Sequence, residues 1–306
     1  MLEYIKIYKN FYKTSELSQL VNDCDISMYT LKNFDKHYNC ISKLNAIKQW
    51  CEENGITTLN EYIKILNDHI LNIKHIFEDE RLIVPQINTG VDAKQMFVSL
   101  EAGRKYLSID LRHAYSQYID SLNIFKERFD DIIFNGLPDF MKESKKARIL
   151  MYFQIPDTSA IKYNVISLFD KVLQSDHDLI KCINKYELKP VSYNIDELIY
   201  DITDCEQDFS QFVGEHTINS IDVKTNVFEQ HYITYFDPIK NKEVTIAVKE
   251  YIDHTNFVTN QCIYMNQLYK AYYSLPLTDY DLYVPNVSNW TKYSKLDEPI
   301  KILEIK

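Results

Sequence analysis

The chain has 306 residues, of which 45% are hydrophobic and 25% charged, so its size and composition are ordinary for a globular protein with a sizeable core. Its net charge of −10 argues against general electrostatic adhesion to nucleic acid or to an anionic membrane, although a local basic groove is still allowed. No stretch approaches the roughly 18 uninterrupted apolar residues of a membrane span, and the first residues lack the apolar segment of a signal peptide. We therefore expect no membrane partner.

Two compositional biases concern source and compartment rather than chemistry. The chain has 24 Tyr and only 5 Gly, and Asn, Ile and Lys are also common, which is typical of an AT-rich coding genome such as that of a phage, a large virus or a low-GC bacterium. Its 6 cysteines form neither a Cys-x-x-Cys pair nor a short disulfide framework, which favours a reducing compartment. We therefore expect a cytoplasmic protein of viral or phage origin.

Residues 1–88 are predicted to form a helical accessory domain. A first helix over about 40–53 ends at Asn54-Gly55, a common C-terminal signal. Thr58 and Glu61 have the spacing of a capping box, and apolar residues at helical spacing follow as far as Ile73. The segment VPQINTG (84–90) is predicted to link this domain to a second one, over 89–306.

The second domain is predicted to begin with strands and to continue with helices. The β-prone runs 97–100 and 106–109 are separated by Ala-Gly-Arg-Lys and predict a hairpin. A helix is expected over about 111–134, followed by the basic segment KESKKAR (142–148) and a mixed helical region that reaches Tyr186.

Two further strand pairs are predicted towards the C-terminus. In VSYNIDELIYDI (191–202), strand-like VSY and LIYDI flank a polar turn, and 231–251 reads as two strands joined at Asp237-Pro238 and Asn241-Lys242. A helix is expected at about 257–275, and the tail after Leu277 reads as irregular. Strands and helices at irregular spacing, without Gly-rich turns, favour an α+β fold in which a helical subdomain precedes an antiparallel sheet with packed helices.

Asp110 stands where an apolar strand, Tyr106 to Ile109, meets the start of the expected helix. A carboxylate at a strand end, close to the positive N-terminal dipole of a helix, stays ionised and can hold a divalent metal. The alternative is an ordinary helix N-cap, in which Asp110 accepts hydrogen bonds from backbone N–H groups.

Asp196 and Glu197 lie where the 191–202 hairpin would turn. Acids are common in turns because turns are solvated, which is the alternative reading of this pair. However, a hairpin tip bearing acids beside a strand end bearing another acid is a common construction of two-metal sites for phosphoryl transfer.

The two acidic stretches resemble motifs A and C of palm-domain nucleic-acid polymerases, including reverse transcriptases and their relatives. Asp110 matches the motif A acid and Tyr115 the aromatic residue five positions later, while Asp196 matches the principal motif C acid with Glu197 beside it. The separation of 86 residues from Asp110 to Asp196 suits the order of motif A, then fingers or motif B, then motif C. SYNIDEL departs from the Tyr-x-Asp-Asp of most reverse transcriptases, and the chain is small for a complete enzyme, so a minimal polymerase, a subunit or an inactivated relative would all fit.

The resemblance implies a palm-like sheet and a metal-dependent nucleotidyltransferase that acts on nucleic acid with nucleoside triphosphates and Mg²⁺ or Mn²⁺. It assigns catalysis to Asp110, Asp196 and Glu197, with the metal on Asp110 and Asp196. Tyr115 would lie under the sugar of an incoming nucleotide and disfavour a 2′-OH. Lys145 and Arg148, on one face of a helix in the basic segment, would contact phosphates.

Two other functions use the same residues differently. A non-catalytic viral or phage protein, which binds a host or replication protein through an acidic surface, predicts that Asp110 and Asp196 lie far apart or are capped by backbone N–H groups. A metal-dependent nuclease would use the same acids. On these readings Tyr115 is a packing residue, and the 142–148 segment is a solvated helix. The sequence has no Gly-rich phosphate loop, Gly-x-Ser-x-Gly or His-Glu-x-x-His motif, which disfavours P-loop, α/β-hydrolase and zincin chemistry.

Overall fold

A computed structural model describes residues 45–86, 98–156, 158–252, 257–258, 264–286 and 289–306. Helices and a large antiparallel sheet make up this part of the chain, which confirms the predicted α+β class. No helix in these ranges is both long and apolar enough to cross a membrane. The beginning of the first predicted helix and most of the predicted linker lie outside the described residues.

The first described segments are helical, as predicted. A helix over 45–53 ends before Gly55, whose φ of +67° suits glycine. The predicted capping box of Thr58 and Glu61 starts α5 (Leu59–Asn72), which α6 (Lys74–Phe77) and η1 (Glu80–Leu82) follow. These segments share one hydrophobic core with helices of the middle region; Trp50, for example, packs edge-on against Phe140. The domain boundary at 88 falls outside the described residues and stays a prediction.

The main sheet has 8 strands, in the order β2-β3-β1-β5-β6-β7, with β4 and β10 as further partners of β5. Its strands are β1 (Lys105–Leu111), β2 (Pro190–Asn194), β3 (Glu197–Asp201), β4 (Gly214–Ile218), β5 (Ile221–Asp237), β6 (Lys242–Tyr251), β7 (Phe257–Val258) and β10 (Lys301–Ile305). Neighbouring strands are antiparallel throughout. A separate pair joins β8 (Tyr283–Asn286) to β9 (Asn289–Lys295).

The connection from β1 to β2 is a long helical excursion. It contains α7 (Ala114–Ser121), α8 (Phe129–Ile133), α9 (Asp139–Glu143), α10 (Lys145–Tyr152), α11 (Thr158–Asn164), η3 (Val165–Ser167), α12 (Leu168–Leu173) and α13 (Asp178–Lys185). The chain returns to the sheet as β2 and turns back as β3, which lies between β2 and β1. Insertion of a strand between the two ends of such a crossover is the split βαβ arrangement.

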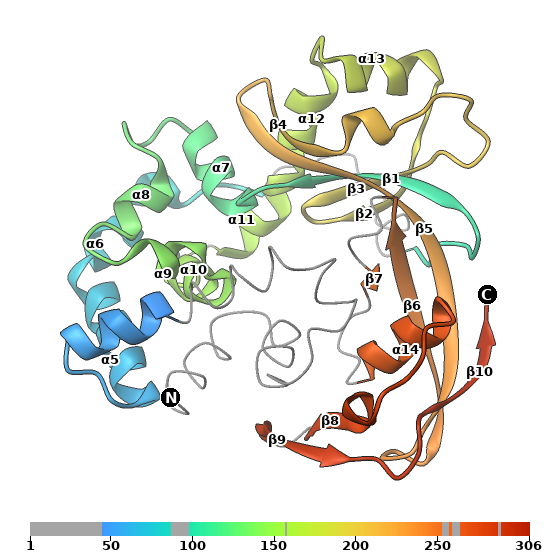
Figure 1. The fold of residues 1–306 in the computed structure, drawn as a ribbon. Helices are drawn as coiled ribbons and strands as arrows, with labels where there is room; N and C mark the ends of the chain where they lie inside the picture. The colour runs from blue at the N-terminus through green and yellow to red at the C-terminus, as the bar shows by residue number, and fades with distance from the viewer. Residues whose placement is uncertain (1–44, 87–97, 157, 253–256, 259–263, 287–288) are drawn as a thin grey trace.

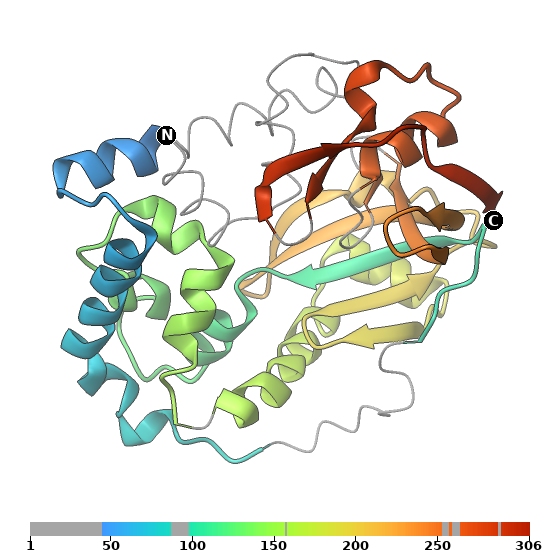
Figure 2. The same ribbon diagram turned by 90° about the horizontal axis from the view of Figure 1, so that it is seen from below.

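The two faces of the sheet differ around β1. Leu107, Ile109 and Leu111 alternate along β1 and are buried in the main core with the helices. On the other face Tyr106 packs against Ile199 and Phe228, and no helix of the described chain contributes to that cluster. Figure 1 shows α12 and α13 on one side of these strands, and Figure 2 shows β2 and β3 beside β1. The face that carries Tyr106 and Asp110 is called the acid-bearing face below.

A second core lies in the C-terminal region. The far halves of β5 and β6 pack against α14 (Met265–Tyr272) through residues that include Ile233, Tyr235 and Leu268. Lys270 of α14 lies 2.6 Å from the carboxylate of Asp281 in η5 (Asp279–Leu282), and both side chains are less than a tenth exposed.

The strand pairs predicted at 191–202 and 231–251 are confirmed, and β5 also extends back to Ile221. The predicted hairpin of 97–100 with 106–109 is wrong, because its described residues 98–100 form no strand. The reason is that β1 already pairs with β3 on one side and with β5 on the other.

The single helix predicted over 111–134 is also wrong, since β1 continues to Leu111 and two short helices follow. Asn123, at φ +55°, lies in the break between them. Of the helix predicted at 257–275, only Met265–Tyr272 is helical in the described chain, and 257–258 form a strand. The tail is not irregular, because it supplies β8, β9 and β10. Partners distant in the sequence decide such short strands.

Candidate active site

The end of β1 and the turn of the β2–β3 hairpin lie together. Asp110 of β1 is directly opposite Glu197 of β3, and the backbone N–H of Leu111 donates to the carbonyl of Asp196 at 2.7 Å. Asp110 lies inside the strand, whereas the N-cap of α7 is His113. Asp110 is therefore not the cap of the helix that follows it.

Five residues form a polar row across the acid-bearing face, because directly opposite residues of neighbouring strands point to the same side. In strand order β2-β3-β1-β5-β4 they are Asn194, Glu197, Asp110, Lys224 and Glu215. Like charges that face one another across a strand pair are destabilising. The directly opposed Glu197 and Asp110 therefore repel one another, and a bound cation would offset that repulsion.

A lysine from a more distant strand contacts this row from outside it. Lys249 of β6 places its Nζ 3.3 Å from Oε1 of Glu197 and 4.4 Å from the ring centroid of Phe228. The side chains of Lys249 and Glu197 are 28% and 18% exposed, so solvent still reaches this ion pair. In the described chain, Glu197 therefore faces one acid and one ammonium group.

Asp196 lies in the two-residue turn before β3. It is close enough to Tyr115 of α7 for its charge to act on the phenol. Burial raises the pKa of the Tyr115 phenol, and the negative charge of Asp196 raises this pKa further. The Tyr115 ring stacks on Tyr152 of α10, with centroids 5.3 Å apart and planes 12° from parallel. The structure thus brings the residues of both predicted motifs to one end of the sheet.

A buried network supports this tyrosine stack. The carboxylate of Asp130 accepts hydrogen bonds from Tyr152 Oη at 2.5 Å and from His113 Nδ1 at 2.8 Å. Burial alone would raise the pKa of Asp130, but these hydrogen bonds outweigh it and the pKa is lowered overall. Because an ionised carboxylate only accepts hydrogen bonds, the proton of this contact belongs to His113 Nδ1.

The basic segment 142–148 spans the end of α9 and the start of α10, and Lys145 and Arg148 both lie on α10, as the phosphate-binding prediction required. Arg148 donates from Nη1 to the carbonyl of Lys142 at 2.7 Å, and its positive charge contributes to the lowered pKa of Asp130. Arg148 therefore lies beside the buried network rather than in the polar row. The side chain of Lys145 lies outside what the structure describes.

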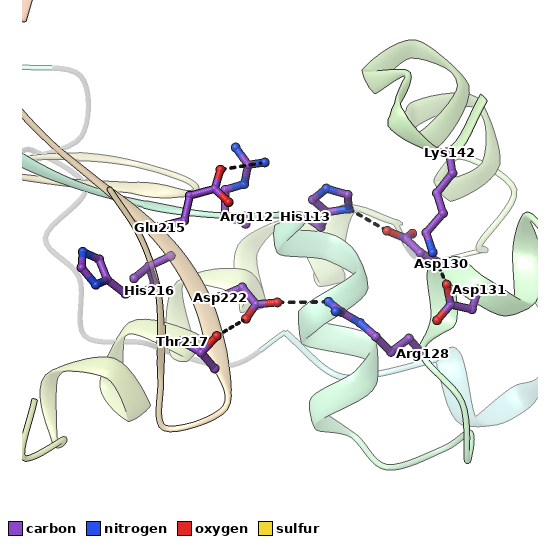
Figure 3. Close-up of a pocket in the computed structure, with 11 residues that line it drawn as sticks. Arg112, His113, Arg128, Asp130, Asp131, Lys142, Glu215, His216, Thr217 and Asp222 are labelled. Atoms are coloured by element: carbon purple, nitrogen blue, oxygen red, sulfur yellow. Dashed lines mark hydrogen bonds and ion pairs between the residues drawn. The ribbon is translucent and has the colours of Figure 1, made fainter. Parts of the chain in front are cut away.

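A pocket of about 420 Å³ opens beyond the end of β1, between the β4–β5 turn and helices α7 to α9 (Figure 3). Its charged walls are paired: Arg112 with Glu215 and Arg128 with Asp222, both at 3.3 Å, and Lys142 with Asp131. His113 and Asp130 of the buried network also line it. Three permanent cations against four carboxylates make this pocket a poor phosphate cradle by itself.

Comparison with protein family models, with curated protein sequences and with solved structures gave no match. The chemistry of the site is therefore derived from its own residues. Within the described ranges, no group of three or more His, Cys, Asp or Glu side chains could hold a metal ion alone. Mg²⁺ is commonly bound by only one or two carboxylates together with waters and substrate phosphates. The oxygen donors of Asp110 and Glu197 fit that mode of binding.

The sequence reasoning missed Lys224, Lys249 and the Asp130 network. Lys249 lies within the strands predicted over 231–251, and the alternation of side chains indicated that it shares a face with every second neighbour. Nothing local to Lys249 indicated that this face carries Glu197, which is 52 residues away. Asp130 was placed inside one long expected helix, where its burial had no local signal.

Proposed function

We propose that this protein is a metal-dependent nucleotidyltransferase with a palm-like sheet, which acts on nucleic acid and uses nucleoside triphosphates. One observation carries the proposal: Asp110 and Glu197 lie directly opposite one another where a strand end meets a hairpin tip, on the acid-bearing face. The split βαβ order of β1, β2 and β3 is the second support, because it places the hairpin turn against the end of β1.

The proposal gives the acids unequal roles. Asp110 and Glu197 would hold the cation, and Asp196, in the turn beside them, would be the third acid of the site. This differs from the assignment by resemblance, in which Asp110 and Asp196 hold the metal, because the strand register pairs Asp110 with Glu197. When bound, a divalent cation would stabilise the negative charge that develops on phosphoryl oxygens during transfer.

Tyr115 would contact the sugar of the incoming nucleotide. Its ring is held in place by the stack on Tyr152, and the pKa of its phenol is raised, so it stays neutral. A fixed ring beside Asp196 would leave little room for a 2′-OH, which favours deoxynucleotides.

The alternative of a non-catalytic interaction protein predicted that Asp110 and Asp196 lie far apart or are capped by backbone N–H groups. The hydrogen bond between Leu111 and Asp196 favours the proposal over the separated arrangement, and the strand position of Asp110 argues against its being the N-cap of α7.

The test is primer extension by the full chain on primed DNA and primed RNA templates, with deoxynucleoside triphosphates and either Mg²⁺ or Mn²⁺. We expect extension by the wild type and its loss in Asp110→Asn. Asp178→Asn, at an exposed acid in the first turn of α13, is the matched control and should extend like the wild type. Shortening of the primer that depends on Asp110 would identify a nuclease instead. Absence of any Asp110-dependent change in the nucleic acid would contradict both and favour the interaction protein.

A further inference from the structure

Lys249 reaches Glu197 across two intervening strands. The order β3-β1-β5-β6 separates their strands by three spacings, about 14 Å in a flat sheet. The register separates them further, because Lys249 is opposite Gln230 of β5, whereas the row of Glu197 meets β5 at Lys224. Nevertheless, Nζ of Lys249 lies 3.3 Å from Oε1 of Glu197, so the two side chains bridge that separation. An ordinary surface lysine would keep its rotamer freedom instead of spanning this distance.

The ring of Phe228 supports the ammonium group of Lys249. Phe228 is fully buried, and Nζ of Lys249 lies 4.4 Å from its ring centroid, within cation–π range. The ammonium group is thus held by a carboxylate on one side and by an aromatic face on another. This places a positive charge beside Glu197, which lies opposite Asp110.

We propose that Lys249 occupies the cation position of Glu197 in the metal-free protein, and that a divalent metal binds only by displacing it. This inference rests on the proposed function in one respect, that Asp110 and Glu197 hold the metal. An ammonium group and a divalent ion beside the same carboxylate oxygen repel one another, so the two occupants exclude each other. By linkage, the free energy with which the Lys249–Glu197 contact stabilises the metal-free protein makes metal binding less favourable by the same amount.

The exchange gives the site a metal-free form in which the opposed acids are compensated. Within the polar row, Lys224 lies opposite Asp110 on the side away from Glu197, so Lys249 is the ammonium group in contact with Glu197 itself. Since the Lys249 side chain is 28% exposed, its ammonium group can move into solvent when the metal arrives. Lys249 is therefore a regulatory residue of the site and not a metal ligand.

The experiment is a titration of the full chain with Mn²⁺ alone, with free Mn²⁺ measured from its electron paramagnetic resonance signal. Lys249→Met keeps the unbranched stem over Phe228 and removes the charge, and should bind Mn²⁺ about fivefold more tightly than the wild type, the equivalent of about 1 kcal/mol. Lys242→Met, at the exposed start of the same strand, is the matched control and should bind like the wild type. In a Glu197→Gln background, Lys249→Met should change nothing. Lys249→Gln serves as a second uncharged variant should Lys249→Met fail to fold.

Two results overturn the inference, and they differ. If Asp110→Asn removes Mn²⁺ binding but Lys249→Met and Lys249→Gln bind no more tightly than the wild type, Lys249 does not compete and the proposed metal site stands. If the wild type and Lys249→Met show no binding that depends on Asp110, the proposed function fails and the inference fails with it.

Discussion

Two lysine–carboxylate pairs of this protein have different surroundings. Lys270 and Asp281 lie 2.6 Å apart in the C-terminal region with both side chains less than a tenth exposed, and Asp281 also accepts hydrogen bonds from the backbone N–H and the hydroxyl of Thr278. Lys249 and Glu197 lie 3.3 Å apart, partly in solvent, and Glu197 directly faces a second acid. The first pair is buried and held by further hydrogen bonds, whereas solvent reaches the second pair, so we expect only the second to exchange its cation. The predictions below test that difference, from the largest expected effect to the smallest.

The largest effect should be on catalysis. Glu197→Gln removes one charge of the proposed metal site and should lower nucleotidyl transfer by about 10³-fold or more, because the metal supplies several kcal/mol of transition-state stabilisation. The measurement is the single-turnover rate of primer extension. Glu243→Gln, at an exposed glutamate of β6, should retain the wild-type rate. Equal rates of primer extension in the two variants would show that Glu197 does not take part in the reaction.

The pair in the C-terminal region should matter for stability instead. Lys270→Met leaves the Asp281 carboxylate buried without its cation and should cost about 3 kcal/mol of unfolding free energy, measured by urea denaturation. Lys249→Met should cost no more than about 1 kcal/mol, since its ion pair is partly exposed. Similar losses of unfolding free energy in the two variants would show that the difference in burial does not change what each ion pair contributes to stability.

The buried network should give a stability effect that depends on pH. Asp130→Asn removes the charge that accepts hydrogen bonds from His113 and Tyr152 and should cost about 2 kcal/mol near pH 7. Because the folded-state pKa of Asp130 lies below its ordinary value of 3.8, the stabilisation is present above that value. It is lost as the pH falls through the folded-state pKa.

The difference between wild type and Asp130→Asn should therefore shrink on acidification. Urea denaturation of both proteins at a series of pH values measures it. A difference that stays constant down to the lowest pH at which both proteins fold would mean that the contribution of Asp130 is not electrostatic.

The smallest effect concerns sugar selection. Tyr152→Leu removes the ring against which Tyr115 is stacked and should reduce the preference for deoxynucleotides over ribonucleotides by a few-fold, because Tyr115 is then less fixed. The ratio of kcat/KM for the two nucleotides is the measurement, since a general loss of structure would lower both values together. Tyr163→Leu, at an exposed tyrosine of α11, is the control. An unchanged ratio in Tyr152→Leu would show that the stack of Tyr115 on Tyr152 does not contribute to the choice between the two nucleotides.

The parts of the fold that could be predicted from the sequence are those with local causes. The capping box at Thr58 and Glu61 and the hairpin around 191–202 depend on residues a few positions apart, and the structure confirms both. The hairpin expected at 97–109 was wrong, and the helix expected from 111 starts later, because β1 pairs with β3 and β5, which are distant in the sequence. Local propensity contains no information on those partners.

The same division applies to the site. That Asp110 ends a strand and that Asp196 and Glu197 lie at a turn followed from neighbouring residues. The sequence did not indicate which of the two hairpin acids faces Asp110. That depends on the strand register, which a turn of only two residues sets, and a shift by one residue would exchange the two faces. The contribution of Lys249 required the path of β6 across the sheet, and only the structure supplies that path.

The central claim is that one divalent cation binds between Asp110 and Glu197 by displacing Lys249. The most direct test is a crystal of the full chain soaked in Mn²⁺ and measured at the manganese absorption edge. The account predicts an anomalous peak about 2.1 Å from carboxylate oxygens of both acids, with Nζ of Lys249 moved away from its 3.3 Å contact. At saturating Mn²⁺, an absence of any peak between the two acids, or a Lys249 still in contact with Glu197, would contradict it.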